Sequence, residues 1–324
     1  MDRRSAIAAV AFGLITAPVL AAAQQPKKVF RVGIASSGIN PRSTSFMRAF
    51  EQRLRELGWV EGQNLAIEYR EGQSPEETPV LVAELVREKV DLLFSSGTDL
   101  NMKATVEATR SIPIVMVALN YDPVERGYIK SLAHPGSNVT GVFARNLEVG
   151  AKQLELLKQA FPNATRVGVL WDIFSAEQLP SIKTAAARLR VEVESVEVRP
   201  PYDLEVAFSR LRDRRVSAVL AVGSPVSYRD RVRIAQLAIN HGLPMVGGPS
   251  GAEGGNLISF GFDLNELYRS AADYVDRILK GAKPADLAVE QPTKFQLIIN
   301  LKTAKALGVT IPQSLLLRAD QIIE

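Results

Sequence analysis

The 324-residue sequence contains no cysteine and only two histidines, His134 and His241. Without cysteine the chain has no disulfide framework, no thiolate metal site and no nucleophilic thiol. Two histidines are too few for a histidine-rich metal site, and both lie where a helix is expected to end, a position that suits a partly charged imidazole. The sequence therefore predicts neither a bound metal nor a cofactor.

Motifs for phosphate and dinucleotide binding are missing as well. No glycine-rich phosphate loop occurs, and Gly33 and Gly38 do not complete the dinucleotide-binding pattern. Gly248–Ala252 approaches the nucleophile elbow of serine hydrolases but ends in alanine instead of glycine. The formal net charge of +4 is spread along the chain, and no basic run is interleaved with aromatic residues, so nucleic acid is not an expected partner. We expect a protein that is not an enzyme.

The N-terminus has the pattern of an export signal. Two arginines precede the apolar stretch Ala6–Leu20, and Ala21–Ala23 offers the small residues that a signal peptidase requires. We expect a signal peptide over residues 1–23, cleaved near Ala23, and a mature chain in the periplasm. No cysteine is present for lipid attachment, so a lipoprotein is not expected. General secretion is favoured over twin-arginine export, because the rest of the twin-arginine pattern is absent.

Short apolar runs alternate with amphipathic segments along the rest of the chain. Phe46, Phe50 and Leu54 recur at helical spacing, Leu264–Leu279 is strongly amphipathic, and Asp122-Pro123 is expected to open a short helix to about residue 133. Strands are expected over residues 29–35, 65–69, 90–94, 112–117, 139–143, 167–171, 191–198, 218–222, 243–246 and 257–260.

Strands that alternate with helices predict parallel sheets covered by helices on both faces. The pattern restarts near the middle of the chain, so we expect the α/β class with two doubly wound parallel-sheet lobes joined by a hinge of several strands. The N-terminal lobe is expected over residues 29–143 with about 261–290. The C-terminal lobe is expected over residues 144–260 with part of 291–324. One large sheet is the alternative, but about nine strands fit two cores better.

Small polar loops follow the expected strands of both lobes. In open parallel sheets, ligands bind beyond the carboxyl ends of the strands, and a loop that enters a helix presents free N–H groups suited to a carboxylate. Each loop alone is explained by helix capping, but their recurrence at one edge of both lobes favours a binding site. The loop residues that we expect to bind a ligand are Ser36, Ser37, Ser96, Gly97, Thr98, Asp122, Gly223, Ser224, Pro249 and Ser250.

Aromatic and acidic residues near the same edge are further candidates. Tyr121, Trp171, Phe174 and Tyr228 are expected to stack on a ligand ring. Asp172, and also Asp99, offer a carboxylate for a ligand ammonium, although Asp99 in the first turn of a helix also suits the helix dipole. Phe260 and Tyr268 are expected to serve core or hinge packing.

Several segments together resemble the substrate-binding proteins of ABC transporters, in the group often labelled as a tryptophan/tyrosine transport system. The resemblance covers nearly all of the mature chain and implies a type I periplasmic-binding fold. The segments that carry it are Gly58–Asn64, Ile67–Arg70, Ile112–Val115, Asp122–Val124, His134–Gly141, Tyr274–Leu287, Glu290–Phe295 and Asn300–Lys305.

This resemblance implies a monomeric periplasmic receptor that closes two lobes around an amino acid, aromatic by the family label, or around a small organic carboxylate. Its implied partner is an ABC permease in the inner membrane. Two alternatives stay open: a ligand-sensing partner of a membrane receptor, with the same fold and pocket, and a secreted α/β hydrolase. The hydrolase needs a Ser-His-acid geometry, for which the sequence offers no motif.

Overall fold

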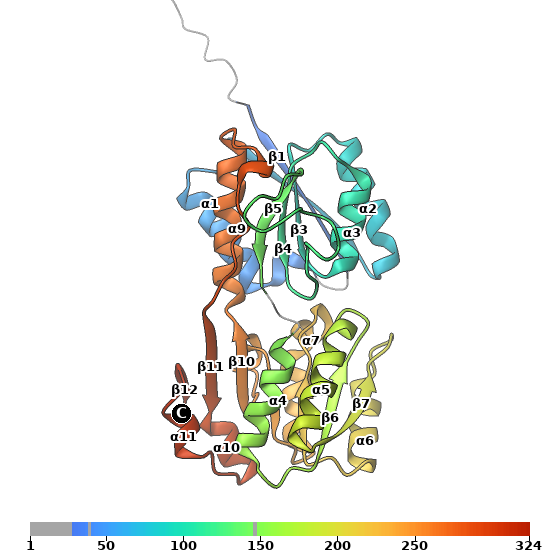
Figure 1. Ribbon diagram of the computed structural model, residues 1–324, viewed down its shortest axis with the longest axis vertical. Coiled ribbons are helices and arrows are strands. Elements are labelled where there is room, and N and C mark those ends of the chain that lie inside the picture. Colours follow the sequence, from blue (N-terminus) through green and yellow to red (C-terminus); the bar gives the residue numbers. More distant parts are fainter. Residues whose placement is uncertain (1–27, 38–39, 145–147) are drawn as a thin grey trace, which may run out of the picture.

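The protein has two lobes, each built on its own β-sheet and arranged one above the other in Figure 1. The computed structural model describes residues 28–37, 40–144 and 148–324. The expected signal peptide therefore lies outside the described residues. The α/β class and the two parallel-sheet lobes that the sequence predicted are confirmed.

The first lobe contains a parallel five-stranded sheet in the order β2-β1-β3-β4-β5. Most residues of these strands are buried, since helices cover both faces of the sheet. The strands are β1 (Phe30–Ser37), β2 (Leu65–Gly72), β3 (Leu92–Gly97), β4 (Ile114–Ala118) and β5 (Val139–Phe143).

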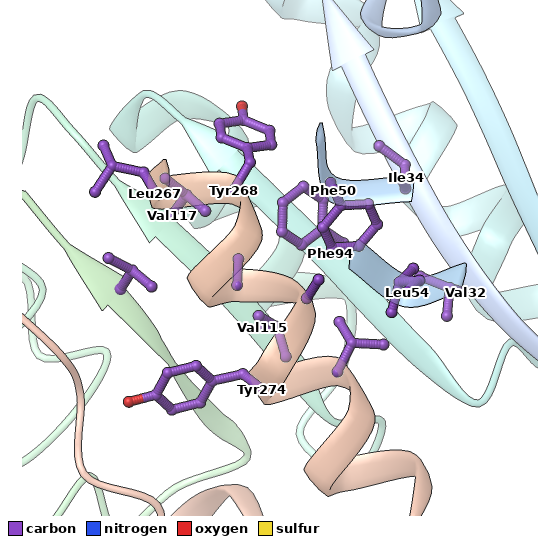
Figure 2. Close-up of a cluster of buried hydrophobic side chains, with 14 of the residues drawn as sticks. Val32, Ile34, Phe50, Leu54, Phe94, Val115, Val117, Leu267, Tyr268 and Tyr274 are labelled. Carbon is purple, nitrogen blue, oxygen red and sulfur yellow. The ribbon is translucent and has the colours of Figure 1, made fainter. Parts of the chain in front are cut away.

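Helices α1 (Ser45–Glu56) and α9 (Leu264–Leu279) cover one face of this sheet, and α2 (Thr78–Arg87) and α3 (Asp99–Ala108) cover the other (Figure 1). Figure 2 shows α9 laying its apolar side on the sheet beside residues of α1 and β3.

Aromatic packing fixes these elements together. The ring centroids of Phe50 and Phe94 lie 4.6 Å apart, and those of Phe94 and Tyr268 lie 5.7 Å apart. Helix α9 therefore completes the first core although it follows most of the second lobe in the sequence.

The second lobe repeats the plan and extends it. Its strand order β7-β6-β8-β9-β10 matches the order of the first sheet, and β11 and β12 are added beyond β10, with β11 antiparallel to it. The strands are β6 (Arg166–Trp171), β7 (Glu192–Glu197), β8 (Ala218–Ala221), β9 (Met245–Gly247), β10 (Ile258–Phe262), β11 (Phe295–Asn300) and β12 (Gln321–Ile323).

Two clusters of buried side chains cover the two faces of the second sheet. Residues of α4, α5, α10 and α11 form one cluster, and residues of α6 and α8 form the other. The helices are α4 (Val149–Ala160), α5 (Leu179–Leu189), α6 (Leu204–Asp213), α7 (Pro225–Arg229), α8 (Arg231–Asn240), α10 (Leu301–Leu307) and α11 (Gln313–Leu316).

The chain passes between the lobes after β5, after β10 and again after α9, so several segments join them (Figure 1). One sequence prediction is wrong: residues 122–133 form turns and not a short helix. The Asp122 carboxylate accepts hydrogen bonds from the N–H groups of Val124 and Glu125, and Gly127 has φ +72°, which a helix does not permit.

Candidate functional site

A cavity of about 170 Å³ lies between the lobes, where the carboxyl ends of both parallel sheets meet. In each sheet the strand order reverses at this edge, between β1 and β3 and between β6 and β8, and such reversal points form crevices. Ten of the residues predicted from the sequence line the cavity: Ser36, Ser37, Ser96, Gly97, Thr98, Gly223, Ser224, Tyr228, Pro249 and Ser250.

The remaining predicted residues do not line it. Tyr121 is 1% exposed and packs edge-on against Tyr128 inside the first lobe. Trp171 packs against the core of the second lobe, and Phe174 is buried there. Asp122 holds the turn described above. These side chains follow strand ends as predicted, but they turn into the lobes and away from the cavity.

Asp172 is 3% exposed, and its carboxylate is hydrogen-bonded within its own lobe. Its carboxylate accepts hydrogen bonds from the Ser224 hydroxyl and from the N–H of Phe174, at 2.9 Å for the latter. Burial raises the pKa of this carboxyl, and the hydrogen bond from Ser224 works against that shift.

Ser224 is fully engaged with its own lobe. Its N–H donates to the Ser227 hydroxyl at 2.8 Å, and its hydroxyl oxygen accepts from the Ser227 N–H at 2.9 Å, which together form a capping box on α7. The Ser224 hydroxyl donates a hydrogen bond to the Asp172 carboxylate. Ser224 therefore lines the cavity without a donor left to offer.

Thr98 presents the opposite situation. It is the N-cap of α3 and is 5% exposed, yet its hydroxyl makes no cap hydrogen bond and has no partner among the described residues. Gly97, with φ +93°, turns the chain so that β3 leads directly into this helix start. The first N–H groups of a helix have no partner within it. The loop therefore offers a buried hydroxyl beside a partly positive helix end.

Aromatic residues form another wall of the cavity. Phe46 of α1 lies between Tyr228 of α7 and Tyr268 of α9, with centroid distances of 4.9 Å and 4.5 Å. The sequence interpretation assigned Phe46 to a helix core and Tyr268 to core or hinge packing. The sequence signal that could have identified both as cavity residues is their position in the first turns of a helix. Helices that follow strand ends begin at the edge of the cavity.

Contacts across the cavity hold the lobes together. The Ser45 N–H donates to the Tyr228 hydroxyl at 3.2 Å. On another side, Asn120 donates from its side-chain amide to the carbonyl of Phe174 at 3.1 Å. Arg126 pairs with Glu177 across the same boundary. We call Phe46 with Tyr228 the aromatic rim, and Asn120 and Arg126 with their partners the polar rim. Phe46, Tyr228 and Asn120 line the cavity, whereas Arg126 and Glu177 lie outside its lining.

The ionised side chain in the lining of the cavity is positive. Among the described residues that line the cavity, Arg231 is the one ionised side chain at neutral pH, and none is Asp or Glu. Within the described part of the chain no group of His, Asp and Glu residues could hold a metal ion. Nor does any helix in that part have the length and apolar character needed to cross a membrane.

The chain is similar to several known proteins. It is 28% identical over 288 residues to a tyrosine-binding protein of Clostridioides difficile, covering 87% of this chain and 82% of that protein. A Vibrio cholerae structure described as a conserved domain protein matches with TM-score 0.81 and 27% identity, covering 91% of this chain and 100% of that one.

A Streptococcus pneumoniae ABC domain in complex with L-Trp matches with TM-score 0.79 and 24% identity, with the same coverage of both chains. Such matches show the type I periplasmic-binding fold. Residues 38–323 match the family described as ABC transporter substrate binding protein. Proteins of this kind bind a ligand and catalyse no reaction, so the chain is not an enzyme. The chain belongs to the ABC transporter substrate-binding protein family.

Proposed function

We propose that this protein captures a small aromatic carboxylate in the periplasm, between its two lobes, and delivers it to an ABC permease in the inner membrane. The observation that carries the proposal is the buried hydroxyl of Thr98, a cavity-lining residue at the start of α3, which has no hydrogen-bond partner among the described residues. A buried polar group without a hydrogen bond costs free energy, and a bound carboxylate would remove that cost.

The aromatic rim supports an aromatic ligand. Phe46, Tyr228 and Tyr268 gather at the cavity, and ring edges and faces of this kind stack on flat apolar groups. The names of two similar proteins agree, since one is a tyrosine-binding protein and the other contains L-Trp. The ligand of this chain is therefore sought among compounds that join an aromatic ring to a carboxylate.

Calorimetric titration of the exported protein with a panel of such compounds tests the proposal. Thr98→Ala removes one hydrogen bond to a charged group, so affinity should fall by about tenfold to a hundredfold, or about 1.5–3 kcal/mol. Thr98→Ser keeps the hydroxyl and is the matched control, with affinity near that of the wild type. Equal affinity of wild type and Thr98→Ala for a bound compound would move the carboxylate away from α3.

Lobe closure is expected to accompany binding, because residues of both lobes line the cavity. Small-angle scattering on ligand-stripped and saturated protein should show a smaller radius of gyration in the saturated sample. An unchanged radius under saturation would contradict capture by closure.

A further inference from the structure

We infer that the ligand carries a carboxylate but no ammonium group, so that it is an aromatic acid and not an amino acid. This inference rests on the proposed function and specifies its ligand class. It is motivated by the sign of the charges around the cavity.

A buried ammonium needs a partner of opposite charge or several good acceptors, because desolvation of an unpaired charge costs several kcal/mol. Among the described residues that line the cavity, no aspartate or glutamate occurs. The internal segments outside the described residues, 38–39 and 145–147, contain no aspartate or glutamate in the sequence.

The two aspartates that the sequence offers for an ammonium are committed elsewhere. Asp99 accepts a hydrogen bond from the Tyr128 hydroxyl at 2.7 Å and pairs with Arg126 at 3.3 Å. Asp172 lies behind Ser224, whose hydroxyl it accepts, and does not line the cavity. Neutral amide oxygens of the lining would give an ammonium weaker hydrogen bonds than a carboxylate gives.

Arg231 adds a positive charge to the lining. It is the first residue of α8, and its guanidinium lies 4.5 Å from the centroid of the Tyr228 ring and donates to the Tyr228 carbonyl at 2.9 Å. None of the ion pairs within the described residues includes Arg231. The neighbouring Arg229 and Arg233, by contrast, pair with Asp230 and Glu205.

The described lining of the cavity therefore combines a helix N-terminus and a cation with no acidic side chain. A zwitterionic amino acid has no net charge, whereas an aromatic acid at neutral pH carries one negative charge. The electrostatic environment favours the anion, and it offers the ammonium of an amino acid no ionic partner.

Calorimetry with matched pairs of compounds tests the inference. L-Tryptophan and indole-3-propanoate share ring, chain and carboxylate and differ only in the ammonium, as do L-phenylalanine and 3-phenylpropanoate. With ligand-stripped protein at pH 7, we expect the compound without the ammonium to bind at least about tenfold more tightly. Tighter binding of the amino acid would overturn the inference and leave the proposed function standing. Binding of neither compound of either pair would overturn both.

Variants of Arg231 and Arg233 separate the role of Arg231 from a general effect of positive charge. Arg231→Gln should weaken binding of indole-3-propanoate by about tenfold. It should also reduce the ratio of the affinity for indole-3-propanoate to the affinity for L-tryptophan. Arg233→Gln lies on the same helix, pairs with Glu205 away from the cavity, and should leave both affinities unchanged. An unchanged advantage in Arg231→Gln, with the fold verified by circular dichroism, would contradict the part assigned to this cation.

Discussion

Thr98 and Ser224 occupy equivalent places in the two lobes, yet only one of them is satisfied by its own chain. Each follows a glycine at the end of the third strand from the β2 or β7 edge and precedes a helix, α3 or α7. The Ser224 hydroxyl donates a hydrogen bond to the Asp172 carboxylate, and Ser224 completes a capping box with Ser227. The Thr98 hydroxyl has no partner in the described part of the chain.

The difference has a cause in the sequence. In the second lobe, the residue after β6 is Asp172, which supplies the acceptor. By the strand registers its counterpart in the first lobe is Ser37, whose hydroxyl is hydrogen-bonded to the Thr78 hydroxyl at 2.7 Å. In this repeated fold, the hydroxyl at the start of α7 is thus hydrogen-bonded within the protein, whereas the hydroxyl at the start of α3 has no partner among the described residues. We expect the first lobe to take the ligand carboxylate and the second lobe to close over it.

The largest expected effect is a difference in stability between variants at Ser224 and Thr98. Ser224→Ala removes a donor from the buried Asp172 carboxylate and an acceptor from the Ser227 N–H, so the free energy of unfolding should fall by about 2–3 kcal/mol. Thr98→Ala removes no hydrogen bond from the unliganded protein and should change its stability by less than about 1 kcal/mol. Urea unfolding without ligand measures both, and equal losses would contradict the comparison.

A smaller effect is expected at the preceding glycines. An added Cβ meets no atom within 4 Å at either Gly97 or Gly223, but only Gly97 has a positive φ, +93°. Gly97→Ala should therefore cost about 1–2 kcal/mol of stability through backbone strain, and Gly223→Ala should cost much less. Thermal unfolding of the two variants checks this, and similar melting temperatures would show that the Gly97 backbone relaxes.

The pH dependence of stability tests the environment of Asp172. Burial raises its pKa, so the folded protein keeps this proton to a higher pH than the unfolded chain, in which aspartates titrate near pH 4. The contribution of Asp172 to stability should therefore fall as pH rises from about 4 through the raised pKa. Asp172→Asn does not titrate, and its profile of unfolding free energy against pH should be flatter in that window. Parallel profiles of variant and wild type would argue against this assignment.

The smallest effect is expected where the lobes meet at the polar rim. The ion pair of Arg126 with Glu177 is exposed and screened by salt, so Arg126→Gln should weaken ligand binding by no more than about 1 kcal/mol. The loss should shrink further at high ionic strength. Phe46→Ala at the aromatic rim, which loses ring contacts with Tyr228 and Tyr268, should weaken binding more. Calorimetry at low and high salt compares the two, and a larger loss in Arg126→Gln would reverse the ranking of the rims.

The fold was predictable from the sequence because strand and helix periodicities are local. The expected bounds of Val139–Phe143 and Leu264–Leu279 agree with β5 and α9. The turns after Asp122 were not predicted, since a proline after aspartate suits a helix start as well as a turn, and Gly127 decides between them.

The cavity was predictable in its backbone and less so in its side chains. The loops after β1, β3, β8 and β9 line it because strand ends meet at one edge whatever their side chains are. Which way Trp171 or Phe46 points depends on tertiary packing, and no sequence pattern carries that information. Trp171 turned to the core of its lobe, and Phe46 turned to the cavity.

Helix α9 has a consequence for the order in which the protein folds. The first lobe is made first by the ribosome, but the sheet face that α1 shares with α9 stays partly uncovered until Leu264–Leu279 has been synthesised, after the strands β6 to β10 of the other lobe. Trp59 then donates to Asp276 at 2.8 Å, and Arg53 pairs with Asp273 at 2.9 Å. Strand β11 arrives later still and joins the second sheet. The last sixty or so residues thus complete both lobes, and the nascent chain stays unfinished, with exposed apolar surface, until its synthesis is nearly over.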